Sequence, residues 1–376
     1  MREQLLLFTE ASSLPDHLPQ PDELRPAFDL LALFDECHNY IYANEGLLKE
    51  RIFHEIVKLL VMKLYDEQIN REGELQFGIT ASEYEALLRG EENPFERRLS
   101  RLYTAVHERY HDLIAETALR LKPLTLAYVV ARLQRVDLTN TPGDVKGEAF
   151  QSFVYRYQRG DRGEFFTPYP VVRLAVEMIA PKPDEKVIDP ACGSGGFLIQ
   201  TISFLRNSFP QTDITAYIRE NVRGVEFNPD IALAATVRLA FEGGTGTEIL
   251  CANSLSEIDE LDGTFDVVLT NPPFGSKGRI EDRRILKEYI LARRWYQDAD
   301  GCWKPSRVVR AGQSPEVLFI EKSLRLLRPG GRMAIVLPDG LLQNISSTYL
   351  RFWIRSQARI LAVVSIPQEA FIPYGT

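Results

Sequence analysis

Two short stretches of the chain combine residue types that could bind a small molecule and position a reacting group. The first covers residues 189–200 and reads DPACGSGGFLIQ, and the second covers residues 269–275 and reads LTNPPFG. In the first, Gly193, Gly195 and Gly196 remove side chains where the backbone must turn tightly and approach a ligand, and a helix beginning near Gly196 would offer free N–H groups. A glycine-rich turn also occurs as a plain strand-to-helix connection, so this motif needs support from elsewhere.

An acidic residue further along the chain narrows the ligand. The segment GVEFNPD places Glu226 at the end of the next expected strand, where its carboxylate can accept hydrogen bonds from ribose hydroxyls. The glycine-rich turn matches neither the G-x-G-x-x-G fingerprint for pyrophosphate nor the GxxxxGK[ST] phosphate loop. A nucleoside without phosphates, such as S-adenosylmethionine, therefore fits better than NAD or ATP. The alternative for Glu226 is a solvent-exposed acid beside a helix start at Asn228 and Pro229.

The second motif has the residues needed to hold a flat group that carries an amine. Asn271 precedes a proline and is biased to an extended conformation, and Pro272 and Pro273 fix two successive φ angles. Because neither proline has an N–H, the turn offers carbonyl oxygens without competing donors. The Asn271 side-chain oxygen and a backbone carbonyl could both accept from one amino group while Phe274 stacks on the ring that carries it. The alternative is a rigid turn at the end of a strand.

Composition and charge limit the classes of protein to be considered. A chain of 376 residues can bury a large core and form two or three domains. The formal net charge of −8 argues against a uniformly basic surface for nucleic acid, although it leaves room for a local basic groove. No apolar run approaches the roughly 18 to 20 residues that cross a bilayer, and the N-terminus does not match a signal peptide. We expect a cytoplasmic protein.

The four cysteines give no sign of a metal site. Cys37, Cys192, Cys251 and Cys302 lie far apart in the sequence, without CxxC spacing. The spacing predicts neither a zinc site nor a disulfide framework, and we expect reduced thiols.

The first part of the chain has helical periodicity. Residues 1–26 carry four prolines among polar residues, which suits an extended arm. From residue 27 to residue 160 apolar residues recur at spacings of three and four, as in EGLLKERIFHEIVKLLVMKLYDEQ and NPFERRLSRLYTAVHERYHDLI. Further helices are expected at LTLAYVVARLQRV and DVKGEAFQSFVYRYQ. Residues 27–160 are therefore predicted to form an all-helical N-terminal domain.

The second part, residues 161–376, alternates short strands with helices. Six runs rich in valine and isoleucine predict strands, namely VIDPAC, VRGVEF, TEILCA, FDVVLTNPP, GRMAIVLPD and ILAVVSIP. Strands separated by crossover helices predict an α/β fold with a doubly wound, mostly parallel, Rossmann-like sheet, and such sheets bind ligands at the carboxyl ends of their strands. Both motifs described first are placed at such ends.

A long basic insertion separates the NPPF motif from the next expected helix, SPEVLFIEKSLRLL. Residues 276–312 exceed an ordinary connection in length. The insertion has five acidic residues against ten basic ones, which are Lys277, Arg279, Arg283, Arg284, Lys287, Arg293, Arg294, Lys304, Arg307 and Arg310. Two interpretations of the insertion are open: it could contact DNA, or it could be a charged loop that is only solvated. Trp295, Tyr296 and Trp303 could stack on bases or close over the edge of a core.

The motifs taken together resemble a known family. The order of FTP, DPACGSGGF, GVEFNP and NPPF in one α/β domain behind a helical region resembles the modification subunit of type I restriction enzymes, an S-adenosylmethionine-dependent DNA adenine-N6 methyltransferase. The resemblance covers residues 146–375. NPPF alone also occurs in RNA-guanine and protein-glutamine methyltransferases, but RGEFFTP ahead of DPACGSGGF is similar to the DNA-adenine group.

The resemblance implies a set of cofactor contacts. S-adenosylmethionine is expected to lie against the GEFFTP segment and the tyrosine that adjoins it, that is Glu164, Phe165, Phe166, Thr167, Pro168 and Tyr169. FFTP also has a purely structural interpretation, in which Thr167 caps a helix and Pro168 is its first residue. The turn under the methionine end of the cofactor is assigned to Ser194, Gly195 and Gly196.

Three polar residues complete the implied cofactor site. Glu226 is expected to hold the ribose, and Asp189 is expected to order the loop or meet the cofactor's amino group. Asn253 stands in CANSL, at the position where the family usually has an acid that contacts the cofactor adenine, so this sequence departs from the family pattern there.

The resemblance also implies the reaction and the partners. Asn271 and the carbonyl of Pro272 would bind the N6 amine of a flipped adenine in DNA, with Pro273 shaping the turn and Phe274 stacking on the base. Two acceptors on the amine favour a more pyramidal nitrogen and spread its developing positive charge. Sequence choice would come from a specificity subunit, in a hetero-oligomer that can include a restriction subunit. An RNA or protein amide methyltransferase and an inactive cofactor-binding scaffold are the alternatives.

The C-terminal end of the sequence is abrupt by comparison with the family. ILAVVSIPQEAFIPYGT finishes one expected strand and a turn, where the family normally continues into another strand. We expect the chain to be a C-terminally truncated fragment of such a subunit.

Overall fold

The computed structural model describes residues 14–27, 29–111, 114, 116–141, 143–157, 167–244, 248–275 and 278–371. The chain separates into two compact units. The first comprises Met1–Gly160 with Thr236–Gly246, and the second comprises Asp161–Ala235 with Thr247–Thr376.

The first unit is helical over its described residues, as the periodicity predicts. Its main helices are α2 (Leu30–Glu45), α3 (Lys49–Ile69), α4 (Ala81–Leu88), α5 (Pro94–Arg109), α6 (Pro123–Leu133) and α7 (Gly143–Tyr157). Phe34, Phe53 and Phe153 are buried at the centre, with ring centroids 5.4 Å apart for Phe34 and Phe153 and 5.3 Å apart for Phe53 and Phe153. These aromatic contacts join α2, α3 and α7 into one core.

Side-chain caps define where several of these helices begin. The Asp29 carboxylate accepts the N–H of Ala32 at the start of α2, and Thr80 forms a capping box with Glu83 at the start of α4. Before α2 the chain is extended around a short 3₁₀ turn, η1 (Pro21–Glu23), and Arg25 pairs with the backbone beside Val136.

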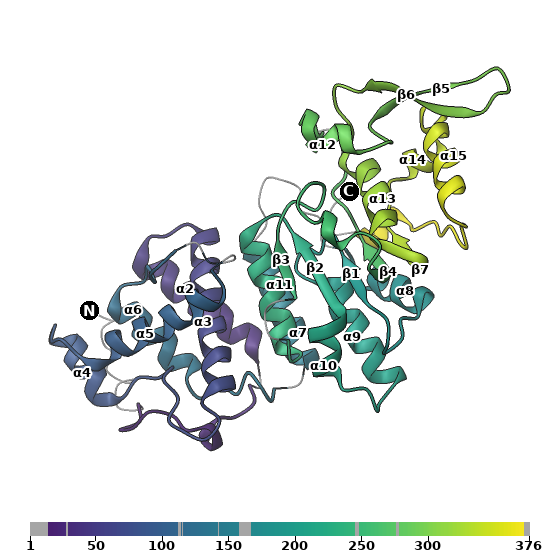
Figure 1. The fold of residues 1–376 in the computed structure, drawn as a ribbon. Coiled ribbons are helices and arrows are strands. Elements are labelled where there is room, and N and C mark those ends of the chain that lie inside the picture. Colours follow the sequence, from purple (N-terminus) through teal and green to yellow (C-terminus); the bar gives the residue numbers. More distant parts are fainter. Residues whose placement is uncertain are drawn as a thin grey trace. The chain divides into compact units, whose positions relative to one another are not determined.

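The second unit is built on a parallel sheet (Figure 1). Its strands lie in the order β3-β2-β1-β4-β7, and their bounds are β1 (Val187–Asp189), β2 (Val222–Glu226), β3 (Ile249–Cys251), β4 (Phe265–Thr270) and β7 (Leu327–Ile335). Helices α9 (Gly196–Ser208), α10 (Ile214–Asn221) and α11 (Pro229–Phe241) make the crossovers from β1 to β3, and α13 (Pro315–Leu326) makes the crossover from β4 to β7. From β1 the chain moves towards one edge of the sheet, and from β4 it moves towards the other edge. Because both sets of connections are right-handed, α9, α10 and α11 lie on one face of the sheet and α13 lies on the other. The predicted α/β fold with a mostly parallel sheet is confirmed.

The divergence places the two chemical motifs on neighbouring strands. β1 pairs with β4 in parallel register, with Val187 opposite Val267 and Ile188 opposite Val268. The glycine-rich loop leaves the carboxyl end of β1, and the NPPF turn leaves the carboxyl end of β4. Helix α8 (Tyr169–Ile179) packs on α9 and also contacts β4 and β7. The segment before α8 therefore reaches the same part of the unit.

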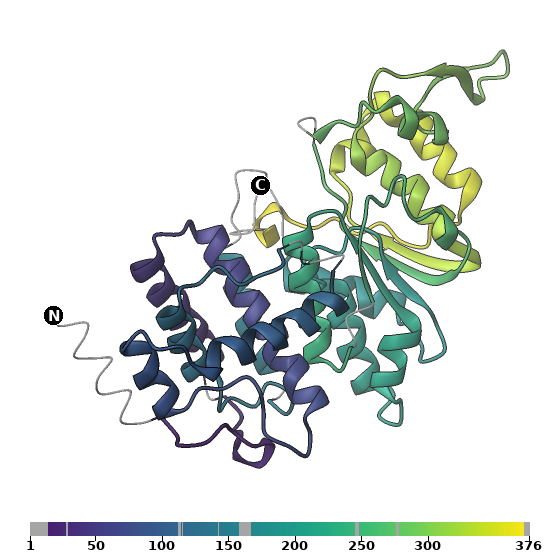
Figure 2. The same ribbon diagram turned by 60° about the vertical axis from the view of Figure 1, so that its left-hand side comes forward.

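The basic insertion is folded over its described residues, 278–312. It contains helix α12 (Arg283–Glu288) and an antiparallel ribbon of β5 (Arg293–Gln297) and β6 (Trp303–Val309). The ribbon projects beyond the neighbouring helices in both views (Figure 2). The chain continues after β7 through α14 (Asp339–Gln343), η4 (Ile345–Ser347) and α15 (Thr348–Gln357), and a further 3₁₀ turn, η2 (Asp259–Leu261), precedes β4.

One strand expected from the sequence is wrong. ILAVVSIP, residues 360–367, has no strand pairing in the structure, and it leads into a 3₁₀ turn, η5 (Gln368–Phe371). Leu361 and Val363 are 76% and 69% exposed. A run of β-branched residues forms a strand only where another strand supplies hydrogen-bond partners and a packing surface, and no described strand does so here.

Candidate active site

The glycine-rich loop has the left-handed turns that its residues suggest. Gly193 and Gly195 have φ values of 53° and 84°, a region that residues with a Cβ rarely adopt. Gly195 is the N-cap of α9, so the helix begins at Gly196, as predicted. Ser194 is buried between the two left-handed glycines. The N–H groups of the first turn of α9 have no intrahelical acceptor and lie at the edge of the sheet.

Asp189 stabilises this loop through a hydrogen bond to its backbone. It is buried at the end of β1, and its Oδ1 accepts the N–H of Ala191 at 3.0 Å. Burial raises the pKa of the Asp189 carboxyl to about 7, although the Thr270 hydroxyl and the Ala191 N–H oppose the rise, and the charge of Glu226 adds to it. The two acids are thus close enough to influence one another, and the charge of Glu226 opposes the ionisation of Asp189.

Glu226 connects the loop to the next strand and helix. Its Oε2 accepts the N–H of Gly193 at 3.1 Å, and its Oε1 accepts the N–H of Asn228 at 2.8 Å. The side chain is half-buried. A carboxylate offers about four acceptor positions, so these two backbone contacts are compatible with ribose hydroxyls as further donors.

Asn271 is held by one side-chain atom and leaves the other unpaired. Its Nδ2 donates to the hydroxyl of Thr167 at 2.8 Å, and its Oδ1 is buried without a hydrogen-bond partner among the described residues. An unpaired buried acceptor costs roughly 1 to 3 kcal/mol, and Asn271 Oδ1 therefore keeps its capacity to accept a hydrogen bond. Pro272 is buried beside it, Pro273 is exposed and Phe274 is half-buried.

Thr167 does not cap a helix, contrary to the structural interpretation of FFTP. The N-cap of α8 is Pro168, without a side-chain cap, and Tyr169 rather than Pro168 is the first helical residue. The Thr167 hydroxyl points instead to Asn271, 104 positions away in the sequence. Tyr169 is 55% exposed. Glu164, Phe165 and Phe166 lie outside the described residues.

Asn253 has a clear local role. Its Oδ1 accepts the N–H of Leu255 at 3.0 Å, and its own N–H donates to Glu257 at 2.6 Å, which orders the turn after β3. Sequence reasoning missed Phe227, which follows Glu226 and is 74% exposed. A large aromatic directly after the acid at a strand end was the available signal. An exposed aromatic ring offers a surface on which a flat base can stack.

A comparison with known families shows to which family the chain belongs. The family model described as N-6 DNA Methylase matches residues 142–376, which is more than half of the chain. The chain belongs to this family. The resemblance that the motifs suggest is therefore confirmed. The match includes the glycine-rich loop, Glu226 and the NPPF turn.

Individual relatives agree with the family. The chain is 28% identical over 255 residues to the type I restriction enzyme EcoEI methylase subunit of Escherichia coli, which covers 66% of this chain and 48% of that protein. It is 24% identical over 375 residues to the StySPI methylase subunit of Salmonella potsdam, covering 92% of this chain and 65% of that protein. The chain therefore spans about half to two thirds of the length of these relatives.

A solved structure supports the fold. The type I restriction-modification methyltransferase subunit of Streptococcus thermophilus superposes with a TM-score of 0.55 at 18% identity, over 87% of this chain and 78% of that one. At this identity the likeness concerns the fold alone.

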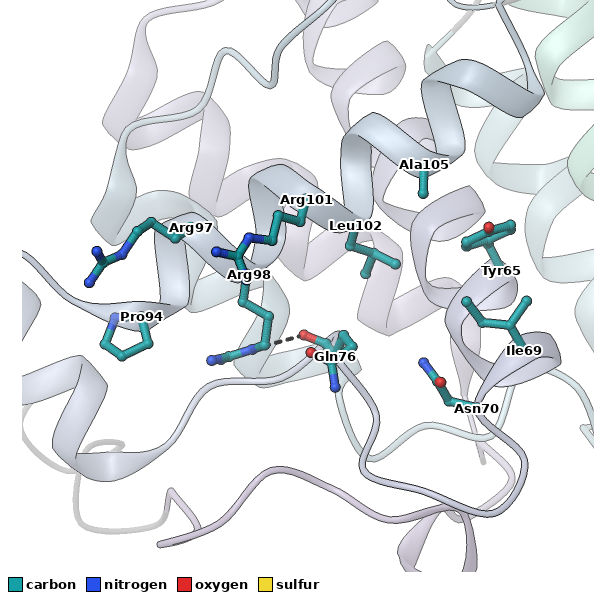
Figure 3. Close-up of a pocket in the computed structure, with 10 residues that line it drawn as sticks. All are labelled: Tyr65, Ile69, Asn70, Gln76, Pro94, Arg97, Arg98, Arg101, Leu102 and Ala105. Carbon is teal, nitrogen blue, oxygen red and sulfur yellow. Dashed lines mark hydrogen bonds between the residues drawn. The ribbon is translucent and has the colours of Figure 1, made fainter.

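One hollow among the described residues lies away from these motifs in the sequence. It has a volume of about 470 Å³ and lies in the helical unit between α3 and α5 (Figure 3). Arg98 on its wall is committed to the Glu83 carboxylate and to the carbonyls of Gln76 and Gly78. No residue of the motifs lines it, so we assign the chemistry to the ends of β1, β2 and β4 instead.

The described residues show no sign of a metal site or of a membrane span. No group of three or more His, Cys, Asp or Glu side chains is placed there to hold a metal ion. Likewise, no helix within that part of the chain combines the length and apolar character needed to span a bilayer.

Proposed function

We propose that this chain transfers a methyl group from S-adenosylmethionine to the N6 amine of a flipped adenine in DNA, as a site-specific adenine DNA methyltransferase. The observation that carries the proposal is the state of Asn271. Its amide nitrogen is fixed by Thr167, and its buried oxygen has no partner among the described residues. An amide oxygen fixed in this way is an acceptor prepared for an amino group.

The residues around the glycine-rich loop fit the cofactor. Gly193 and Gly195 bring the backbone close without side chains, and Asp189 and Glu226 make the surroundings acidic. An acidic site repels the phosphates of NAD or ATP and suits a cationic nucleoside without phosphates. S-adenosylmethionine supplies an activated sulfonium methyl group. We assign the ribose to Glu226 and the adenine of the cofactor to Phe227, with Asn253 and the segment of Thr167, Pro168 and Tyr169 on the rim, and Glu164, Phe165 and Phe166 preceding it.

The NPPF turn would hold the acceptor base. Asn271 Oδ1 and the Pro272 carbonyl accept the two N6 hydrogens, and the developing positive charge on nitrogen is spread onto these oxygens. The nitrogen gains the methyl group and loses one proton to water. Flipping the base costs a few kcal/mol, and stacking on Phe274, worth roughly 1 to 3 kcal/mol at comparable sites, offsets much of that cost.

The partners follow from the relatives. Proteins similar to this chain are named as methylase subunits of type I restriction enzymes. We propose that the chain acts on DNA in a hetero-oligomer with a specificity subunit and with a restriction subunit, in the cytoplasm. In this arrangement residues 1–26 are an arm, residues 27–160 are a helical domain and residues 161–376 are the catalytic domain.

The test is transfer of labelled methyl groups to DNA by the complex with the specificity subunit, read as N6-methyladenine. Asn271→Ala should lower the rate roughly 100- to 1,000-fold, the size found for removal of one preorganised group of this kind. Thr167→Val should cause a smaller loss, roughly fivefold, because it removes only the contact that positions Asn271, and Thr167→Ser should restore the rate. Binding of S-adenosylmethionine should stay within about twofold in the Asn271→Ala variant, because that residue is assigned to the acceptor base and not to the cofactor.

Asn207, which is exposed in the last turn of α9, provides the matched control. Asn207→Ala should behave as wild type. The proposal fails if Asn271→Ala methylates DNA at the wild-type rate, or if the label appears in RNA or protein and not in DNA.

A further inference from the structure

The basic insertion is firmly attached to the catalytic unit. Ile280 pairs with Gln313 at its base, and the N–H groups of Ile290 and Leu291 donate to the Glu321 carboxylate of α13 at 3.0 and 2.8 Å. Tyr289 is buried and donates its hydroxyl to the carbonyl of Leu255 at 3.0 Å. These contacts fix the position from which the β5–β6 ribbon projects.

The ribbon has one face that packs and one that is open. Trp295 and Trp303 lie against Tyr349 of α15, with ring centroids 5.6 and 6.4 Å away. Tyr296 and Lys304 are register partners, so their side chains share the opposite face. Tyr296 is 51% exposed there.

Two arginines on the ribbon are exposed and form no ion pair with the residues that the structure describes. Arg294 precedes Tyr296 by two residues and therefore lies on the open face. Arg307 lies in a bulge of β6 opposite Arg294, because the register steps from the pair of Arg293 and Val309 to the pair of Trp295 and Pro305. Both arginines are exposed, and neither has an ion-pair partner among the residues that the structure describes.

The acids of the ribbon do little to neutralise these two charges. Asp298 is engaged within the hairpin, because its Oδ1 accepts the N–H groups of Asp300 and Cys302 and its Oδ2 pairs with Lys304 at 2.8 Å. Arg294 and Arg307 thus form a local positive surface on a chain whose net charge is −8.

We propose that the exposed side chains of the β5–β6 ribbon bind duplex DNA, with Arg294 on the open face and Arg307 in the bulge contacting backbone phosphates and Tyr296 exposed beside Arg294. The inference rests on the proposed function and adds a surface to it. In the sequence the insertion follows the NPPF turn, and it belongs to the same unit of the chain as β1 and β4. A two-stranded ribbon has the width that a major groove admits. Charge complementarity selects the DNA backbone as its partner.

The chain offers an internal reporter for this contact. Its three tryptophans are Trp295, Trp303 and Trp353, and all three lie in the cluster formed by the ribbon and α15. Tryptophan emission therefore reports on the folding of the ribbon in each variant and on its surroundings when DNA is added.

The experiment titrates the full chain with a 30-base-pair duplex over a series of salt concentrations, following tryptophan emission and anisotropy of labelled DNA. The double variant Arg294→Ala, Arg307→Ala should bind DNA more weakly than wild type. The magnitude of the slope of log K against log salt should fall by about 2, one for each lost phosphate contact. Arg294→Lys, Arg307→Lys should restore the slope because the charges remain. In the methylation assay the alanine variant should raise the KM for DNA and leave kcat unchanged.

A charge-matched control is available at the opposite edge of the sheet. Arg206 and Arg219 are exposed near the ends of α9 and α10, and their double alanine variant should keep the wild-type slope. The inference is overturned if the ribbon variant binds DNA with the wild-type slope and affinity, or if the wild-type chain fails to bind duplex at low salt. It is also overturned if polyglutamate perturbs the tryptophans and duplex DNA does not, which would indicate an acidic protein partner.

The two proposals fail separately. Salt-dependent DNA binding through the ribbon without any transfer of methyl groups to DNA would contradict the proposed function alone. Methyl transfer that depends on Asn271, with no effect of the ribbon variant on DNA binding, would contradict the ribbon alone.

Discussion

The carboxyl group of Asp189 lies at the end of β1, where it supports the glycine-rich loop from a buried position. A carboxyl in such a position is costly to ionise, and its pKa is about 7 in the folded chain against 3.8 for an ordinary aspartate. The site thus contains one acid, Asp189, whose charge changes near neutral pH beside Glu226.

This raised pKa gives a pH-dependent prediction. Because the folded state holds the Asp189 proton more tightly than the unfolded state, ionisation destabilises the folded state increasingly from about pH 4 to pH 7 and by a constant amount above pH 7. Asp189→Asn keeps an oxygen for the Ala191 N–H and removes the ionisation. Its unfolding temperature should exceed that of wild type above pH 7, and the difference should shrink towards pH 4. Parallel curves for the two proteins would contradict the assigned pKa.

At the scale of elements, the close approach of β2, α9 and the glycine-rich loop depends on one residue without a side chain. Gly224 lies within β2, opposite Asp189 on one side and Ile249 on the other. A Cβ added there would lie 2.7 Å from Ile249 Cδ1, 2.8 Å from Leu198 Cδ1 and 3.0 Å from Cys192 Sγ. The strand, the helix and the loop are therefore packed around the space that this glycine leaves.

Gly224→Ala should accordingly destabilise the chain by about 1 to 3 kcal/mol, the usual range for overpacking a core. Chemical unfolding measures this loss, and binding of S-adenosylmethionine should weaken with it because Cys192 belongs to the loop. Gly147→Ala is the matched control: Gly147 lies in α7 with no atom near the added Cβ, and the change should be neutral or stabilising by up to about 1 kcal/mol. Equal effects of the two substitutions would show that Gly224 is not a packing position.

At the scale of the whole molecule, the helical unit is held together by a charge network as well as by its aromatic core. Glu116 accepts from His54 at 2.9 Å and pairs with Arg51 at 2.9 Å, Arg120 at 3.6 Å and Lys58 at 3.7 Å. Burial would raise the pKa of Glu116, but the hydrogen bond from His54 and the charge of Lys58 outweigh it and lower the pKa to about 2.

A lowered carboxylate pKa has the opposite pH dependence to that of Asp189. The stabilisation is fully present above the unfolded value of 4.5 and is lost as the pH falls through about 2. Glu116→Gln should therefore unfold at lower denaturant concentration than wild type at pH 7, and the two proteins should converge as the pH falls from about 4.5 to 2. A constant difference over that range would mean that the carboxylate charge does not stabilise the unit.

The residues that act through the local backbone could be predicted from the sequence. The left-handed glycines, the start of α9 and the start of α11 all depend on neighbours in the chain, and they were found where the motifs place them. Asn271 was also identified, because its position before two prolines is local. The expected strand at residues 360–367 failed because its formation depends on a partner strand, which local composition cannot supply.

Contacts between distant segments were decided by the tertiary structure alone. Thr167 was read as a possible helix cap, and only the packing of α8 beside β4 turns its hydroxyl to Asn271. The packing role of Gly224 and the separation of the ribbon tryptophans from its two exposed arginines were equally invisible in the sequence.

The sequence by itself determined the chemical groups, the fold class and the order of the motifs, because these follow from residue types, periodicity and rigid backbone conformations. The tertiary structure decided that β1 and β4 are neighbours, so that the glycine-rich loop and the NPPF turn meet at one edge of the sheet. It also decided that the nitrogen of Asn271 is bound and its oxygen is not. Strand order and side-chain pairing depend on which surfaces are buried together, and that is a property of the whole folded unit.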